Sequence, residues 1–453
     1  MRHAHFIVLS LLAAGSLLVA EPVLGQWMGG ESVPIGEPAP GLSAGESDSR
    51  FDFKIDGTLG AATITNPETG LKEIFNTIAL QPELSFGKLG LGLDLYVYFN
   101  SDGKFREDDW DTQEDFVSKI WYVRWGKRGD PLHARVGGLS GTTLGHGFIM
   151  GNYTNRLRYP DVRQVGAVAG LDVGYGGFEA VATDIRRPTL HGGRVFLRPL
   201  YGTDIPLLKN LAFGLSGVSD RDPDGFKGTQ NDQVSVYGVD LDMPVFKNDL
   251  FSATLFADAA LMRLGRRYTQ AGSKDNGKGG TAGVGGNILF LSYSAEMRVI
   301  EDNFIPNFFD AYYEVDRSSG TSLKADRIPS VHRARRTGPL VQVYADILNR
   351  LHIGAFYESL NSDPLGIYPR LWGEIRIDPE LLLNKFYAAA RYEQRNVEQF
   401  KRIGQTRDPN TIMTTEIGYK PNENLTIVIV QKQTFDLSGK PVRSTQIRAD
   451  VRF

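Results

Sequence analysis

The chain has 453 residues, with 50 Lys and Arg against 53 Asp and Glu, so its formal net charge is −3. This balance gives no basic surface for a polyanion and excludes nucleic acid as an expected partner. Because the chain contains no Cys, disulfides, thiol-ligated metals and a lipid-modified N-terminal Cys are also excluded. The length suits either two soluble domains or one large barrel.

The N-terminus has the pattern of an export signal. Arg2 precedes an uncharged apolar run over residues 6–20. A run of about 15 residues suits the apolar region of a signal peptide and is short for a membrane-spanning helix. We expect residues 1–25 to be a signal peptide cleaved after Gly25, with an uncleaved anchor helix as the alternative. Residues 26–50 are rich in Gly, Pro, Ser and Glu without periodicity, which predicts a flexible periplasmic tail.

From residue 51 onward, runs typical of strands follow one another, each about 9–12 residues long, a length that suits a tilted membrane strand. In these runs apolar side chains alternate with polar or charged ones, and a strand points successive side chains to opposite faces. The clearest runs are 91–99, 237–243, 293–299, 371–378 and 386–395. A soluble, half-buried sheet would show the same alternation, so the alternation alone does not decide the environment.

The connections between these runs fall into two length classes. Short turns are predicted at 87–90, 175–177, 246–249 and 420–424, and long polar loops at 100–115, 138–163, 220–232, 265–280, 301–337 and 396–410. Short turns at one end and long loops at the other are typical of outer-membrane barrels. With both termini at the short-turn end the strand number is even, and we expect about 18–20 strands, with 16 as the lower bound.

The last strand separates an apolar face from a charged one. Ile447, Ala449, Val451 and Phe453 alternate with Gln446, Arg448, Asp450 and Arg452. A final amphipathic strand that ends in Phe resembles the closing strand of bacterial outer-membrane β-barrels. Over residues 51–453 the chain therefore resembles the porin-like barrels of Gram-negative outer membranes. This resemblance implies an all-β fold with a single closed antiparallel transmembrane β-barrel in the outer membrane. It also implies contact with outer-membrane lipid and lipopolysaccharide, and with the barrel-assembly machinery through the C-terminal strand.

The function implied by the resemblance is a channel for passive or weakly selective diffusion of small hydrophilic solutes. No catalytic, metal or cofactor motif is present, so we expect no enzyme activity and no cofactor. Fixed charges that point into a narrow lumen select solutes through their local field. The expected pore-lining residues are Asp94, Asp240, Glu296, Arg298, Glu374, Arg376, Arg391, Glu393, Arg395, Arg448, Asp450 and Arg452. Cross-strand ion pairing is the alternative role for each of them.

Residues 137–155 are the most unusual stretch of the chain, because they carry almost no charge and follow the fifth expected strand. In position and length they resemble the constriction loop of general porins, without its acidic cluster. The sequence leaves open whether 26–50 or 138–163 folds into the lumen. It also leaves open the solute, the pore radius and the oligomeric state. The run Gly277–Gly280 is interpreted as a flexible loop, since it lacks the strand-to-helix context of a phosphate loop.

Two other functions remain open. A plugged barrel could act as an envelope anchor or binding protein through its long extracellular loops. A barrel lipid hydrolase is the weaker alternative, because Ser140 and His146 share one loop and could form a nucleophile and base.

Overall fold

The computed structural model describes residues 52–65, 72–112, 115–116, 119–156, 164–205, 207–223, 232–248, 250–266, 276–311, 313–317, 335–362, 366–395, 411–435 and 441–452. The predictions of a signal peptide over 1–25, a periplasmic tail over 26–50 and a terminal Phe453 lie outside these residues. Within them the chain is almost entirely β-structure. No helix of the described residues is long and apolar enough to span a bilayer.

The described strands form one sheet of 21 strands. The first half contains β1 (Asp52–Thr65), β2 (Lys72–Phe86), β3 (Leu89–Leu93), β4 (Leu95–Phe99), β5 (Ile120–Trp125), β6 (Leu132–Gly137), β7 (Gly166–Asp172), β8 (Gly176–Ala182), β9 (Leu190–Leu197) and β10 (Ala212–Asp220). The second half contains β11 (Val234–Lys247), β12 (Phe251–Leu264), β13 (Asn276–Ile288), β14 (Leu291–Asp302), β15 (Arg336–Ile347), β16 (Leu351–Ser362), β17 (Gly366–Ile377), β18 (Phe386–Arg395), β19 (Thr411–Asn422), β20 (Leu425–Phe435) and β21 (Pro441–Arg452).

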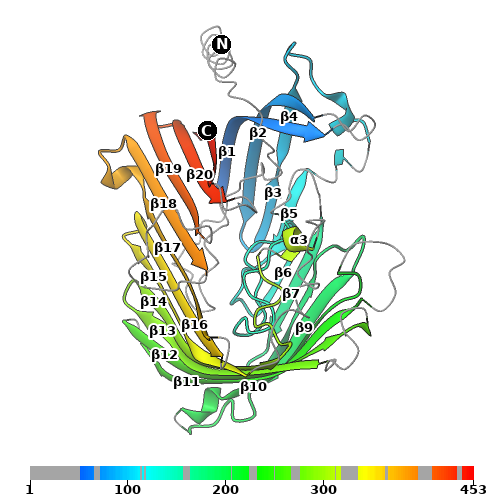
Figure 1. Ribbon diagram of the computed structural model, residues 1–453, viewed down its shortest axis with the longest axis vertical. Helices are drawn as coiled ribbons and strands as arrows, with labels where there is room; N and C mark the ends of the chain where they lie inside the picture. Colours follow the sequence, from blue (N-terminus) through cyan, green and yellow to red (C-terminus); the bar gives the residue numbers. More distant parts are fainter. Residues whose placement is uncertain are drawn as a thin grey trace.

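The sheet closes on itself in an antiparallel ring. β1 pairs with β21 over four residues on each strand, and the strands between them pair with their neighbours in the chain. β3 and β4 both pair with β2 and are interrupted only at Asp94, so together they act as one strand. Counted this way, the described strands make a ring of twenty, within the predicted range, and the predicted single antiparallel barrel is confirmed. Figure 1 shows the strands following the chain order around a central interior.

Most connections alternate in length as the sequence predicts, with two exceptions: β9 and β10 are far apart in the chain at the short-turn end, and β16 and β17 are close together at the other. β2 and β3 are joined at Gly87 and Lys88, and β13 and β14 at Leu289 and Phe290. Two other connections on this short-turn end contain single turns of 3₁₀ helix, η2 (Leu208–Asn210) and η5 (Pro379–Leu381). At the opposite end, the connections contain η1 (Glu107–Asp109) and the short helix α3 (Tyr313–Asp316).

The outer face of the sheet is apolar, and the exposed apolar residues lie on the alternating positions that the sequence predicts. Leu215 on β10 is 60% exposed, and its register partner Val239 on β11 is 52% exposed. Between these outward positions, Val218 and Asp240 are buried on the inner face. Exposed aliphatic residues on paired strands form an apolar outer band, a kind of surface that water-soluble monomers rarely expose.

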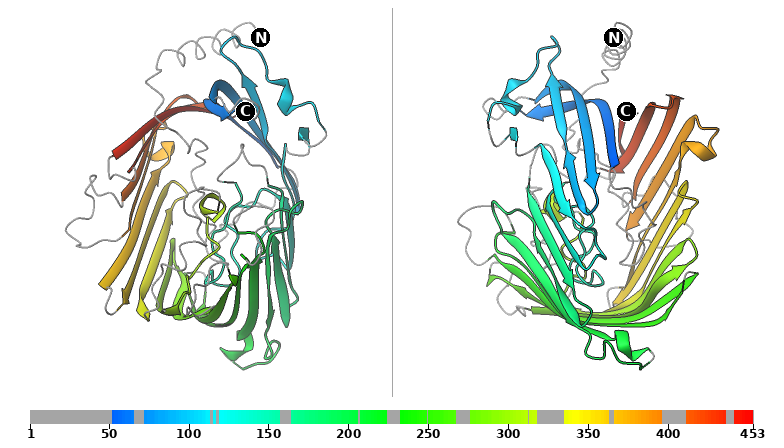
Figure 2. Two further views of the ribbon diagram at one scale, coloured as in Figure 1. Left: turned by 45° about the vertical axis from the view of Figure 1, so that its right-hand side comes forward. Right: turned by 180° about the vertical axis from the view of Figure 1, so that it is seen from behind.

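The hydrophobic core lies inside the barrel. It is built from the inner faces of β8 to β14 and from two loops that fold inward, residues 138–156 and 303–317. The loop residues in this core are Leu139, Leu144, Phe148, Ile149, Met150, Tyr153, Phe304, Phe308, Phe309 and Tyr313. Figure 2 shows the helix α3 and the chain around it between the walls of the barrel. The sequence left open whether 138–163 enters the lumen, and the described part of that loop does.

The interpretation of Gly277–Gly280 as a flexible loop is wrong, because these residues lie in β13. The glycines of this run have a packing role, because they carry no side chain. A Cβ on Gly277 would collide with the backbone nitrogen of Phe304, and one on Gly279 would lie 2.6 Å from the Phe304 ring. Glycines in a strand often mark a close approach of another backbone. Here they let the loop 303–317 lie directly against the wall.

Candidate functional site in the barrel interior

The loop that follows β6 forms a small hairpin inside the barrel. Thr142 and Tyr153 exchange two backbone hydrogen bonds of 2.9 Å, and the Leu144 amide donates to the Met150 carbonyl over 3.0 Å. Gly145 and Gly147 both have positive φ, the conformation that glycine adopts most readily, and they form the tip of the hairpin. We call residues 142–153 the inner hairpin.

The inner hairpin and the second inward loop bind each other as one body. Met150 and Phe309 form a parallel bridge, and the amide of Asn307 donates to the carbonyl of Phe148 over 2.7 Å. The Asn307 side chain in turn accepts a hydrogen bond of 2.7 Å from the Gly151 amide. Because the two loops share these bonds and a set of fully buried aromatic rings, they narrow the barrel as a unit.

A buried polar network joins the same two loops to the wall. The hydroxyl of Tyr153 donates to Glu314 over 2.6 Å, and that of Tyr313 donates to Asp220 on β10 over 2.8 Å. Arg317 lies 3.4 Å from Asp220 and 3.5 Å from Glu314. Burial and the adjacent Glu314 carboxylate hold the pKa of Tyr153 well above its usual value, so the hydroxyl remains a donor.

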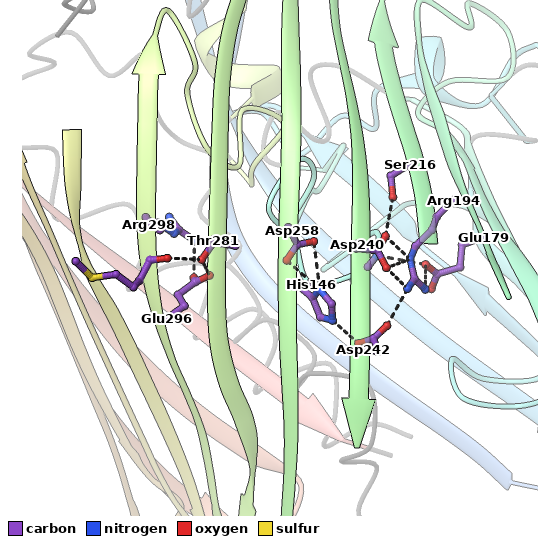
Figure 3. Close-up of polar contacts among 12 residues, drawn as sticks. His146, Glu179, Arg194, Ser216, Asp240, Asp242, Asp258, Thr281, Glu296 and Arg298 are labelled. Carbon is purple, nitrogen blue, oxygen red and sulfur yellow. Dashed lines mark hydrogen bonds and ion pairs between the residues drawn. The ribbon is translucent and has the colours of Figure 1, made fainter. Parts of the chain in front are cut away.

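The tip of the inner hairpin carries His146, which lies between two carboxylates of the wall. Its Nδ1 lies 3.0 Å from Asp258 on β12, and its Nε2 bonds to Asp242 on β11. The ring stacks on Phe256, with 4.6 Å between the centroids. Since both partners of the ring are carboxylates, both ring nitrogens must donate, and the ring is an imidazolium. Figure 3 shows His146 between Asp242 and Asp258.

Burial alone would lower the pKa of His146. The hydrogen bonds to Asp242 and Asp258, together with the two negative charges, outweigh it and raise the pKa to about 10.

A second cation continues this cluster along the wall. Arg194 on β9 is bonded to Asp240, and its Nη2 lies 2.9 Å from Asp242, so Asp242 is shared between Arg194 and His146. Glu179 on β8 lies 3.9 Å from Arg194 and accepts a hydrogen bond of 3.3 Å from the Gly145 amide. The tip of the inner hairpin is thus held by charged side chains from β8, β9, β11 and β12 (Figure 3).

Arg298 on β14 lies at the edge of the inward loops. It pairs with Glu296 and with Glu358 on β16, both at 2.7 Å, and its guanidinium stands 5.8 Å above the Phe148 ring. Thr281 donates to the same Glu296 over 2.6 Å. Asp94 forms a comparable contact at the other edge of the loops, 2.8 Å from Arg156.

The wall from β16 to β18 carries a different set of charges. Arg391 lies 3.6 Å from Glu374, and Arg370 lies 3.2 Å from Glu393. Arg376 lies 3.4 Å from Asp378 at the short-turn end. These arginines are more exposed to solvent than those beneath the inward loops.

The structure places eight of the predicted pore-lining residues on the inner face and leaves four undescribed. The eight are Asp94, Asp240, Glu296, Arg298, Glu374, Arg376, Arg391 and Glu393. The side chains of Arg395, Arg448, Asp450 and Arg452 lie outside the described residues, although their backbones belong to β18 and β21.

Around the tip of the inner hairpin, sequence reasoning missed four charged residues, Glu179, Arg194, Asp242 and Asp258. Asp242 follows Asp240 at the period of a strand, and that spacing was the available signal. Only the fold, however, shows that His146 meets it.

Within the described ranges no group of three or more His, Cys, Asp or Glu has the arrangement of a metal site. His146 uses both ring nitrogens on carboxylates, which leaves neither for activating Ser140.

No protein-family model matches the chain, and no curated protein matches it. Among solved structures, the chain is similar to OpdL of Pseudomonas aeruginosa, with 10% identity and a TM-score of 0.35 over 89% of this chain and 98% of that one. A BenF-like porin from Pseudomonas fluorescens Pf-5 matches with the same four values. OpdO of Pseudomonas aeruginosa has 9% identity and a TM-score of 0.37, over 89% of this chain and 96% of that one. At these low TM-scores the matches carry no further argument about this chain. The evidence for a barrel is the strand pairing described above.

Proposed function

We propose that this protein is an outer-membrane channel through which small hydrophilic solutes pass by passive or weakly selective diffusion. The apolar outer band supports a membrane position, because only a bilayer leaves aliphatic residues on neighbouring strands uncovered by protein. The charged inner face supports an aqueous lumen. In this setting the outer face meets lipid and lipopolysaccharide, and the C-terminal strand β21 is the segment that the barrel-assembly machinery receives. Hydrolysis is not part of the proposal, given the carboxylate partners of His146.

The observation that carries the proposal is the unequal exposure of the inner-face arginines. Beneath the inward loops, the side chains of Arg194 and Arg298 are 8% and 10% exposed. On β17 and β18, those of Arg376 and Arg391 are 39% and 29% exposed. All four arginines occupy inward positions of their strands. The difference in their exposure therefore comes from the covering loops and not from the alternation of inward and outward side chains. The passage therefore runs along β16 to β18, and the loops form the other side of the constriction.

The test is the ion selectivity of single channels in planar bilayers, using Arg391→Gln and Glu374→Gln. The two residues form one ion pair, so each variant removes one charge from the same place. Loss of Arg391 makes the passage more negative and should shift the reversal potential toward cation preference. Loss of Glu374 should shift it in the opposite direction. Lys88→Gln, on the exposed β2–β3 turn, is the matched control and should leave the selectivity unchanged.

Two results would count against the proposed passage. If neither variant shifts the reversal potential, solutes do not pass along β16 to β18. A protein that inserts and remains electrically silent would show that the inward loops block the lumen completely.

A second function gains support from the way those loops pack. Met150, Phe304, Phe308 and Phe309 are completely buried, so the two loops form a well-packed body and not a loose flap. A barrel sealed by such a body would act as an anchor or binding protein through its long loops. The silent outcome of the bilayer experiment favours this function over the channel.

A further inference from the structure

The short-turn end of the barrel has an unusual backbone feature. Nine described residues other than glycine have positive φ, and four of them are the leucines Leu207, Leu289, Leu348 and Leu383, with φ between 53° and 67°. All four lie in connections at this one end. For a residue with a bulky side chain this conformation is unfavourable, and Gly or Asn normally occupies it. Turns that keep Leu there need a reason beyond turn geometry.

Packing inside the protein does not supply that reason. Leu348 and Leu383 are 76% and 82% exposed, and Leu207 and Leu289 are also exposed. We call these four residues the leucine rim. Neighbouring turns are bonded to one another, since the Leu289 amide donates to the Leu250 carbonyl over 2.7 Å. The rim is therefore part of the ordered end of the sheet.

The leucine rim continues the apolar outer band. Past Leu383 the chain enters β18 at Phe386, which is exposed and pairs with the exposed Tyr419 of β19. On β10, Leu215 lies close behind the turn that contains Leu207. The apolar surface thus extends from the strands to the tips of the turns, where a barrel end bathed in water would be polar.

A cation accompanies the leucine at a fixed spacing in three of these turns. Leu207 is followed two residues later by Lys209, Leu348 by Arg350, and Leu383 by Lys385. All three cations are exposed. An aliphatic side chain beside an ammonium or guanidinium matches a phospholipid, whose acyl chains and phosphate lie next to each other at the membrane interface.

We propose that the leucine rim and these three cations bind the phospholipids of the leaflet at the short-turn end. The leucines insert among the acyl chains, and Lys209, Arg350 and Lys385 contact the phosphates. This inference rests on the membrane position proposed above. A bilayer is favoured over a protein partner because the motif recurs in turns from β9 to β18. These turns span about half of the barrel circumference and continue the apolar outer band, so a medium that already covers that band would also cover the rim.

The chain has no Cys, so single cysteines can be labelled with an environment-sensitive fluorophore on the full mature chain. Labels at Leu348→Cys and Leu383→Cys test the rim, Leu215→Cys marks the outer band, and Glu423→Cys marks a short turn with exposed polar residues. The protein is refolded into vesicles of phosphatidylethanolamine and phosphatidylglycerol that contain phosphatidylcholine brominated in its acyl chains. Quenching by the bromines and by iodide on both sides of the membrane is then measured.

The rim is confirmed if the labels at 348 and 383 lose fluorescence to the brominated lipid as the label at 215 does, and are protected from iodide. It is overturned if they respond to iodide as the label at 423 does while the label at 215 stays in lipid. If the label at 215 is also in water, the membrane position itself is wrong. Protection of 348 and 383 from both quenchers would indicate a protein or a second copy on the rim and would overturn the lipid assignment.

The contribution of the cations is measured separately, with the triple variant Lys209→Gln, Arg350→Gln and Lys385→Gln. We expect the wild-type protein to fold in greater yield in vesicles with phosphatidylglycerol than in vesicles of phosphatidylcholine alone, and the triple variant to lose this preference. An unchanged preference would remove the phosphate contact from the proposal.

Discussion

His146 offers the sharpest test of how the inner hairpin is held. The ring donates to Asp242 and Asp258 and is mostly buried on Phe256, so its positive charge is needed by two carboxylates at once. A pKa that moves from 6.5 to about 10 corresponds to about 5 kcal/mol in favour of the charged ring. Removing one member of a buried ion pair costs a similar amount, about 3–5 kcal/mol.

The sign of the pH dependence follows from the direction of that change. Because the folded-state pKa of His146 is raised, its contribution to the free energy of unfolding is complete below about pH 6.5. It declines as the pH rises above that value and is lost once the pH passes the folded-state pKa of about 10. The stabilising contact is thus one that alkali, not acid, should release.

The substitution His146→Gln keeps an amide donor of similar size but removes the charge. We expect it to lower the free energy of unfolding by about 3–5 kcal/mol near pH 6, and by much less near pH 10. The measurement is urea unfolding of both proteins in lipid vesicles, followed by tryptophan fluorescence at several pH values. Groups that do not contact His146 titrate alike in both proteins and cancel in the difference. A difference that stays constant from pH 6 to pH 10 would refute the imidazolium.

Three further predictions concern the same inward loops. Asp94→Asn removes the carboxylate charge from the buried ion pair with Arg156 and should lower the free energy of unfolding by about 3–5 kcal/mol, measured by urea unfolding. A cost below about 1 kcal/mol would mean that the pair is solvated. Phe309→Ala leaves a cavity in the core that the two loops share, so it should lower the free energy of unfolding by about 3–5 kcal/mol and increase single-channel conductance. A folded variant with wild-type conductance would place the passage away from the loops. Gly277→Ala should displace the loop at Phe304 and increase conductance. Gly280→Ala is the control and should not, because its added methyl meets only the Asp258 carbonyl at 3.4 Å. Equal effects of the two substitutions would contradict the close approach of Phe304 to Gly277.

The strand architecture could be predicted from the sequence because alternation is local. Each strand shows its two faces within about ten residues, as Tyr237 and Val239 against Asp240 illustrate. Turn lengths are local too, and their two classes distinguish the two ends of the barrel. The prediction of a flexible run at Gly277 failed because the constraint on it comes from Phe304, which approaches from another loop.

The interior could be predicted only in part. Alternation identifies inward positions such as Asp240 and Arg298, but it does not say what covers them. One partner of Asp242 is a histidine 96 residues earlier in the chain, in a loop with no periodicity of its own. Contacts of this kind depend on how two loops fold against one wall, and no local pattern encodes them.

The inner-face charges therefore divide by location and not by residue type. Arg194 and Arg391 are both inward arginines beside carboxylates, yet Arg194 is closed off by the inner hairpin while Arg391 keeps contact with solvent. A charge in the first setting stabilises the constriction, since its partners are desolvated and fixed. A charge in the second acts on whatever passes, since water and ions reach it. Variants of the charges under the loops should therefore lower stability, and a change in conductance should follow from that loss. Variants of the charges on β16 to β18 should change ion selectivity with little cost in stability.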